Sequence, residues 1–177
     1  GRKFHRVHLR PLGQTFIVMQ YDLDRPDNQR FVPVTRYLED ELNVAVPKLC
    51  GFDEERRMVW LQDLGEIDLW SQRLQPWPLI APLYRKTLDE VWKIHAVPES
   101  EISCELEPPF SAGLYRWEQE YFYEHFLSHQ SRLKPTQVEA LFESKDWKEL
   151  AEELGALPRF LVHRDFQSRN VMVYRGE

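Results

Sequence analysis

A polar loop near the end of the sequence, set between two apolar runs, constrains the fold more than any other feature. The loop reads His-Arg-Asp-Phe-Gln-Ser-Arg-Asn over residues 163–170, and the apolar runs are 160–162 and 171–174. Apolar runs on both sides hold a loop rigidly, and a rigid loop can aim several polar groups at one point. The sequence therefore predicts a preorganised polar site in residues 163–170.

The loop has the spacing H-R-D-x-x-x-x-N, which suits phosphoryl transfer. That reaction needs a carboxylate beside the attacking hydroxyl and a metal-binding oxygen near the phosphates. We expect Asp165 to accept the hydroxyl proton and Asn170, a neutral oxygen ligand, to coordinate Mg²⁺. His163 would orient the loop, and Arg164 or Arg169 would neutralise nearby negative charge. Asp165 and Asn170 alone would favour a simple turn stabilised by their side chains.

The first part of the sequence carries strand patterns around a single helix. Residues 3–9 and 15–21 are two β-like stretches joined by a Pro/Gly turn, which predicts a hairpin. Apolar positions three or four apart predict a helix over 30–42, and residues 49–52 and 58–62 form a second pair of expected strands. This order predicts a small antiparallel sheet with one helix packed on it.

The sequence after Gly65 changes to helical patterns. Prolines are expected to break up the first segment: Pro76, Pro78 and Pro82. A stripe of apolar side chains predicts a helix over 84–95. Aromatic side chains are dense in residues 114–128, which predicts a mostly buried helix. Capping residues predict the starts of two further helices, Thr136 with Glu139 for one and Ser144 for the other.

Charge balance and apolar pattern exclude two classes of protein. The chain has 177 residues with 23 Lys and Arg against 29 Asp and Glu, a formal net charge of -6. This balance argues against nucleic-acid packaging, because non-specific affinity for nucleic acid comes mainly from basic residues. No apolar run approaches the roughly 20 residues that cross a bilayer. The charge balance and the apolar pattern therefore predict neither nucleic-acid nor membrane partners. Cys50 and Cys104 lack C-x-x-C spacing and fit free thiols in a reducing compartment, so we expect a cytoplasmic protein.

The loop and its flanks, residues 162–173, closely resemble the catalytic loop of the aminoglycoside phosphotransferase superfamily, which shares the protein-kinase-like fold. The residues between Asp165 and Asn170, Phe-Gln-Ser-Arg, are most similar to those of bacterial anomeric kinases of N-acetylmuramate and N-acetylglucosamine, which recycle cell-wall sugars. Other stretches resemble the same family: 16–19 the strand after the nucleotide loop, 58–65 the strand and hinge between lobes, and 88–95 the helix after the hinge. The likeness runs along nearly the whole chain.

The resemblance implies a two-lobe α+β fold, with a sheet lobe over residues 1–65 and a mainly helical lobe over 66–177. It implies ATP and Mg²⁺ as cofactors. It also implies that the backbone of three hinge residues meets the adenine edge: Gln62, Asp63 and Leu64. The implied acceptor is a hydroxyl of an amino sugar. Aminoglycosides or other small molecules are alternative acceptors, and a non-catalytic kinase-like binding module is the alternative from another class.

The sequence departs from the kinase pattern where phosphates are held. Protein kinases carry a Lys on the third strand, in a V-A-I-K pattern, and the matching position here is Met19. The helix acid that would pair with such a Lys would be Glu39 or Glu41. Basic residues beside the first strand are the alternative phosphate ligands: Arg2, Lys3 and Arg6.

A second departure concerns the metal. The enzymes of this superfamily continue after the loop to an Asp on the next strand, which binds Mg²⁺ together with the Asn. No candidate for that Asp follows Asn170 in the sequence. We therefore expect the 177 residues to be a piece of a longer protein, with both lobes partial, and we expect this piece alone to be inactive.

Overall fold

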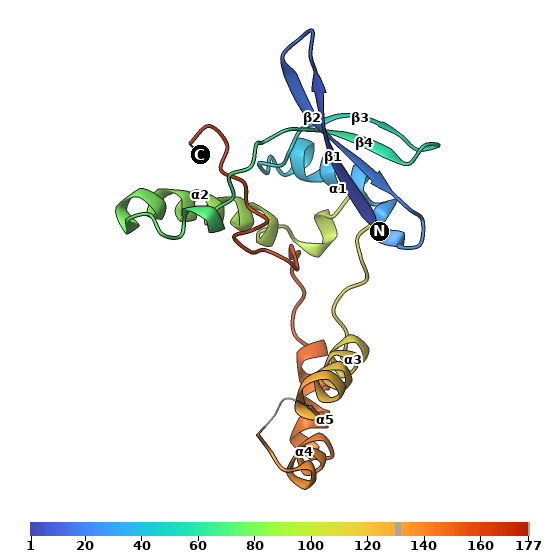
Figure 1. Cartoon of the computed structure of the whole chain (residues 1–177). Helices are drawn as coiled ribbons and strands as arrows, with labels where there is room; N and C mark the ends of the chain where they lie inside the picture. The colour runs from blue at the N-terminus through green and yellow to red at the C-terminus, as the bar shows by residue number, and fades with distance from the viewer. Residues whose placement is uncertain (130–131, 177) are drawn as a thin grey trace. The chain divides into compact units, whose positions relative to one another are not determined.

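The computed structural model describes residues 1–129 and 132–176 (Figure 1). The chain divides into two compact units, one made of residues 1–107 with the segment that begins at Phe160, and the other of residues 108–159. The fold class is α+β, with an antiparallel sheet followed by helices, as the sequence predicts. None of the described helices is long and apolar enough to cross a membrane.

Four strands form the sheet of the first unit: β1 (Arg2–Leu9), β2 (Gln14–Tyr21), β3 (Leu49–Asp53) and β4 (Met58–Gln62). All neighbouring strands are antiparallel, in the order β1-β2-β4-β3. Both hairpins match the strand pairs that the sequence predicts. The pairing of β2 with β4 joins the two hairpins across the helix that separates them in the sequence.

The core of this unit lies between the sheet and that helix. Met19 and Val59 are opposite each other in the β2–β4 pair and both are 0% exposed, and Leu61 is 6% exposed. Partly buried side chains surround them: Ile17, Tyr21, Phe31, Val32 and Leu49. Position 19, which the resemblance matches to the Lys of protein kinases, is therefore filled by an apolar core side chain.

The helix predicted over 30–42 is present but changes its winding. It begins as α1 (Phe31–Arg36) and continues as the π-helix η2 (Tyr37–Glu41). The wider turn is closed by a bond from Leu42 N to the carbonyl oxygen of Tyr37 (3.1 Å). Single π turns within helices are frequent at functional sites. This one begins at Tyr37, which is buried at 2% exposure.

The prediction that prolines break up the first helical segment is wrong. Helix α2 runs from Trp77 to His95 and contains Pro78 and Pro82. Pro78 lies in the first turn, where a backbone N–H has no partner within the helix, so it costs no hydrogen bond. Pro82 removes one bond further on, and the buried Ile80 and Ile94 hold the helix in place on either side. Three short 3₁₀ turns complete the unit: η1 (Pro26–Asn28), η3 (Trp70–Gln72) and η4 (Glu99–Glu101).

The second unit is helical. Its elements are α3 (Ala112–Phe122), the π-helix η5 (Tyr123–Leu127), α4 (Pro135–Phe142) and α5 (Lys145–Gly155). Ser144 caps α5 as predicted, because its hydroxyl accepts a bond from Trp147 N (3.2 Å). A Cβ on Gly155 would lie 2.6 Å from the backbone nitrogen of Ala112. Glycine at this position therefore lets the end of α5 approach the start of α3.

The predicted cap of α4 by Thr136 and Glu139 is wrong. The helix begins at Pro135, whose ring fixes a backbone angle that suits the first helical position. The cap therefore moves to Lys134, whose backbone N–H donates to Gln137 Oε1 (3.0 Å).

The prediction that residues 114–128 are mostly buried is also wrong. Trp117 is 57% exposed and Tyr121 is 54% exposed, although Leu127 is buried. Helix α3 contacts α5, and its Phe122 ring stacks on Trp147 with centroids 6.4 Å apart, whereas Trp117 and Tyr121 pair with each other at 5.5 Å. High aromatic content therefore does not bury this helix.

Candidate active site

Asp165 and Asn170 lie side by side in the loop that the sequence singles out. Asn170 Nδ2 donates to Asp165 Oδ2 (2.8 Å) and to the Asp165 carbonyl oxygen (3.0 Å). Gln167 Nε2 donates to Asp165 Oδ1 (2.9 Å). Both oxygens of the carboxylate are thus oriented from within the loop, and the residues predicted as base and metal ligand are in direct contact.

Backbone geometry fixes the direction of the carboxylate. Asp165 N donates to the carbonyl oxygen of His163 (2.9 Å), and Gln167 N donates to that of Asp165 (3.1 Å). Arg164 has a φ of 66°, a left-handed conformation that costs a non-glycine residue about 1–3 kcal/mol. The ring of Phe166 meets the ring of His163 edge-on, with centroids 5.6 Å apart. A tight, strained turn therefore presents Asp165, and strain of this kind clusters at functional sites.

The loop offers oxygen ligands to a hard metal ion. Asp165 and Asn170 are both exposed, so their oxygens are accessible from solvent. Mg²⁺ prefers such ligands and is usually held by one or two protein oxygens together with water and substrate phosphates. Within residues 1–129 and 132–176, no cluster of three or more His, Cys, Asp or Glu side chains could hold a metal by itself. Two oxygen-bearing side chains in one loop are a donor set that fits Mg²⁺.

Backbone pairing joins the loop to the segment that follows the hinge. Three hydrogen bonds of 2.7, 2.8 and 3.1 Å link residues 67–70 with residues 168–173. Asp68 and Met172 also form an antiparallel bridge. Residues 67–70 and the loop are thereby held in one fixed relation, although they are far apart in the sequence.

Trp70 is the side chain that supports this junction. The Arg169 guanidinium lies over its indole ring, 5.4 Å from the ring centroid, and the Arg73 guanidinium lies 4.4 Å from it. Trp70 N also donates to the carbonyl oxygen of Ser168 (3.1 Å). Because Arg169 immediately precedes Asn170, the indole ring fixes the chain next to Asn170.

Arg6 on β1 binds the segment predicted as the hinge. Its guanidinium donates to both carboxylate oxygens of Asp63 (2.7 and 3.1 Å) and to the carbonyl oxygen of Gly65 (3.0 Å), and it pairs with Glu66. The Asp63 side chain is only 6% exposed. Burial opposes its ionisation and is the largest influence, but the hydrogen bonds from Arg6, Gly65 and Thr15 together outweigh burial and lower the pKa of Asp63 below its usual value.

The other predicted hinge residues lie at the end of β4. Gln62 N donates to the carbonyl oxygen of Lys48 (2.9 Å), and Gln62 Oε1 accepts from Lys48 N (3.3 Å). Leu64 follows and is half-buried, and Gly65 then turns the chain with a φ of 86°. A left-handed φ favours glycine, so Gly65 sets the point at which the chain leaves the sheet.

The predicted phosphate ligands on β1 differ in their surroundings. The Arg2 guanidinium donates to Asn28 Oδ1 (2.7 Å) and to Asp27 Oδ2 (3.1 Å), and it lies over the Phe31 ring. Arg2 thus ties β1 to the segment that leads into α1. Lys3 is exposed and lies opposite Gln20 in the sheet. Asp165, His163 and Asn170 all lie in the polar loop. The Arg2 guanidinium instead binds Asn28 and Asp27.

Sequence reasoning missed two contacts of the site. The stacking of Trp70 on Arg169 and the pairing of Arg6 with Asp63 each join residues that lie far apart in the sequence. For the first, the available signal was a Trp within three residues of Asp68 and Arg73. The second contact was missed because Arg6 lies among other basic residues on β1, a pattern that predicted phosphate ligands rather than a partner for Asp63.

Replacing Arg6 by Met is expected to raise the pKa of Asp63, because burial would then oppose ionisation without its main compensation. In the wild type, the lowered pKa means that ionised Asp63 stabilises the fold above its ordinary pKa of 3.8. That contribution is lost as the pH falls through the lower folded value. The stability difference between wild type and R6M should therefore be largest above the ordinary pKa and shrink in acid.

Urea denaturation at a series of pH values, with an NMR titration of the Asp63 carboxyl, measures both effects. Lys145→Met is the matched control, because Lys145 forms an exposed helical ion pair with Glu149. Exposed pairs of this kind contribute little. Identical pH dependence in R6M and wild type would show that Arg6 does not hold Asp63 ionised.

Comparison with known proteins gives a family for the chain. The model described as "Phosphotransferase enzyme family" matches residues 1–177. No curated protein matches the chain. The match includes the sheet, the hinge and the loop that carries Asp165 and Asn170.

Proposed function

This chain belongs to the phosphotransferase enzyme family, and we propose that it transfers the γ-phosphoryl group of ATP to a hydroxyl of an amino sugar. The observation that carries the proposal is the contact between Asn170 Nδ2 and Asp165 Oδ2 (2.8 Å) in a loop with the spacing H-R-D-x-x-x-x-N. Phosphoryl transfer is catalysed mainly by positioning and by electrostatic stabilisation. A fixed carboxylate beside a metal-binding amide supplies both.

Each residue of the loop has a role in this proposal. Asp165 accepts the proton of the attacking hydroxyl, in the orientation that Asn170 and Gln167 impose. Asn170 supplies an oxygen ligand for Mg²⁺, and His163 and Arg164 hold the turn. Bound Mg²⁺ would neutralise negative charge that develops on the phosphate oxygens.

The nucleotide is placed by the sheet and the hinge. We assign residues 1–65 to the nucleotide-binding lobe and residues 66–177 to the lobe that carries the loop. The backbone of residues 62–64 meets the adenine edge, and Arg6 supports it from β1 through Asp63. Basic residues at the start of β1 meet the phosphates, with Lys3 more accessible than Arg2, whose guanidinium is bound to Asn28.

The amino-sugar acceptor is proposed because the residues between Asp165 and Asn170 are similar to those of the sugar kinases of cell-wall recycling. The test is ATP consumption by the purified full-length protein that contains these residues, with N-acetylmuramate, N-acetylglucosamine or an aminoglycoside as acceptor. We expect turnover with an acetylated amino sugar. Turnover with the aminoglycoside alone would mean that the acceptor is an aminoglycoside and not an acetylated amino sugar. ATP binding without turnover on any acceptor would favour a non-catalytic binding module.

Replacing Trp70 by Ala is expected to lower kcat by up to about 10²-fold, because small displacements of a positioned group are costly in catalysis. The Km for ATP should change much less, since the indole ring supports the loop and its contacts are with Arg169 and Ser168. Steady-state kinetics with varied ATP separate the two effects. Trp70→Phe keeps an aromatic face for Arg169 and should recover most of the lost kcat.

Trp92 provides the control for this experiment, because it is 72% exposed on α2. Trp92→Ala should leave kcat within a few-fold of the wild type. If Trp70→Phe is as impaired as Trp70→Ala, stacking on Arg169 is not what supports the loop.

A further inference from the structure

Two guanidinium groups at the polar loop, residues 163–170, are held in place but not neutralised. Arg169 lies over the Trp70 ring, 5.4 Å from the centroid, and Arg73 lies 4.4 Å from the same centroid. Within the part of the chain that the structure describes, neither arginine forms an ion pair. Positive groups that share one ring repel each other, and an anion beside them would be stabilised.

Other arginines of the first unit are held by acids. Arg6 donates to Asp63 (2.7 Å) and Arg30 donates to Glu105 (3.1 Å), so their charges are compensated within the chain. Stacking on an indole ring orients Arg169 through its flat face instead. The N–H donors at the edge of a guanidinium stay available in such an arrangement. Arg169 is therefore oriented and still able to bind.

Two acids lie near these arginines in the sequence, and both are bound elsewhere. Asp68 Oδ1 accepts from Ser71 N (2.6 Å). The oxygens of Asp165 accept from Asn170 Nδ2 (2.8 Å) and from Gln167 Nε2 (2.9 Å). Both arginines are exposed, so an anion from solution can reach them.

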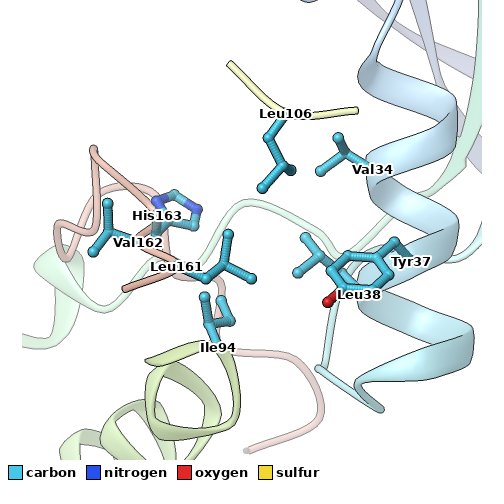
Figure 2. Close-up of a pocket in the computed structure, with 8 residues that line it drawn as sticks. All are labelled: Val34, Tyr37, Leu38, Ile94, Leu106, Leu161, Val162 and His163. Atoms are coloured by element: carbon cyan, nitrogen blue, oxygen red, sulfur yellow. The ribbon is translucent and has the colours of Figure 1, made fainter. Parts of the chain in front are cut away.

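The loop that carries Arg169 is anchored on two sides. On one side, Trp70 N donates to the carbonyl oxygen of Ser168 (3.1 Å). On the other, just before the loop begins, Leu161 lines a small apolar space together with Ile94 and points into it (Figure 2). A guanidinium on a loop held this way loses little freedom when it binds, which favours affinity.

Arg169 also begins close to the proposed base. Asn170, the next residue, contacts Asp165 directly (2.8 Å), and consecutive Cα atoms are only about 3.8 Å apart. An acceptor with its hydroxyl at Asp165 would therefore have its other substituents within reach of this guanidinium. Arg169 and Arg73 both belong to residues 66–177, which we assign to the lobe that carries the loop and not to the nucleotide-binding lobe.

We propose that Arg169 and Arg73, held on Trp70, bind a carboxylate of the acceptor and select acidic acceptors over neutral ones. This inference rests on the proposed function and narrows its acceptor to an amino sugar that carries a carboxylate. The planar guanidinium fork matches a carboxylate with two parallel hydrogen bonds. N-acetylmuramate has such a group on its lactyl ether, and N-acetylglucosamine has none.

N-acetylmuramate and its neutral carboxamide are the probes, because they have nearly the same shape and differ in charge. Calorimetric titration of the full-length protein that contains these residues, with Mg²⁺ and a non-hydrolysable ATP analogue, gives both affinities. We expect the wild type to bind the carboxylate about tenfold more tightly, the effect of one charge-assisted hydrogen bond. In Arg169→Met this preference should vanish. Arg169→Lys should keep part of it, because the charge remains and the fork is lost.

Arg36→Met is the matched control and should keep the full preference. Arg36 also lies over an aromatic ring, with its guanidinium 5.1 Å from the Phe52 centroid, but it belongs to α1. The ratio of two affinities within one variant cancels any general disturbance of the loop, so a distorted Arg169→Met loop cannot imitate the result.

The outcomes separate this inference from the proposed function. Equal affinities in the wild type, or a preference that persists in Arg169→Met, overturn the inference and leave an amino-sugar acceptor in place. If Arg169→Met weakens the ATP analogue and not the preference, the arginine meets nucleotide phosphates, and the inference is again wrong. If neither sugar binds the wild type, the amino-sugar acceptor fails together with the inference.

Discussion

Phosphoryl transfer by the Asp165→Asn variant is expected to fall by about 10²–10⁴-fold, the range that general acid–base catalysis contributes. The amide of Asn has nearly the shape of the carboxylate but cannot accept the proton of the attacking hydroxyl. The loop itself should persist, because an amide oxygen can still accept the bond from Asn170 Nδ2. The loss should therefore appear in kcat, with the Km for ATP changed far less.

ATP consumption measured with the acceptor that supports turnover gives this result directly. Asp89→Asn is the control, because Asp89 is exposed on α2. This substitution makes the same chemical change at a position outside the loop. Circular dichroism of both variants should match the wild type. An Asp165→Asn enzyme with unchanged kcat would mean that another group takes the proton, and the proposed role of Asp165 would be wrong.

The strands could be predicted because their signals are local. Residues 15–21 and 58–62 have β-like composition, and turn residues mark their ends, so each hairpin is encoded within a short stretch. The pairing of β2 with β4 is different. It joins two hairpins across a helix and depends on the burial of Met19 against Val59. No local sequence pattern predicts that contact.

The helical errors arose from judging residues without their position in the helix or their packing. Pro78 and Pro82 were expected to interrupt α2, but one lies in the first turn and the other removes only a single bond near that end. Trp117 and Tyr121 were expected in a core, but both are more than half exposed although α3 contacts α5. Composition alone cannot supply either fact.

The candidate site likewise has a part that the sequence predicts and a part that it does not. Asp165 and Asn170 could be predicted together because a short loop carries both, and the structure shows them in contact. Trp70 could not be predicted from the loop, since backbone pairing between residues 67–70 and 168–173 is what brings its ring under Arg169. Contacts between distant segments depend on the completed fold.

Met19→Lys is expected to destabilise the first unit by about 3–5 kcal/mol, the cost of leaving a buried charge without a partner. Met19 is 0% exposed and lies opposite Val59 in the sheet core, with Leu61 beside it. An ammonium group there would lose its water and meet only apolar side chains. Because domains are stable by only about 5–15 kcal/mol, much of the folded population could be lost.

Met19→Leu is the matched control, since Leu and Met exchange in cores usually at less than about 1.5 kcal/mol. Urea denaturation of both variants gives the free energies of unfolding, and nucleotide titration gives their affinities for ATP. A stable Met19→Lys variant that binds ATP more tightly than the wild type would place position 19 at the phosphates, as the kinase pattern would have it. The predicted instability would instead mean that this chain uses position 19 for its core.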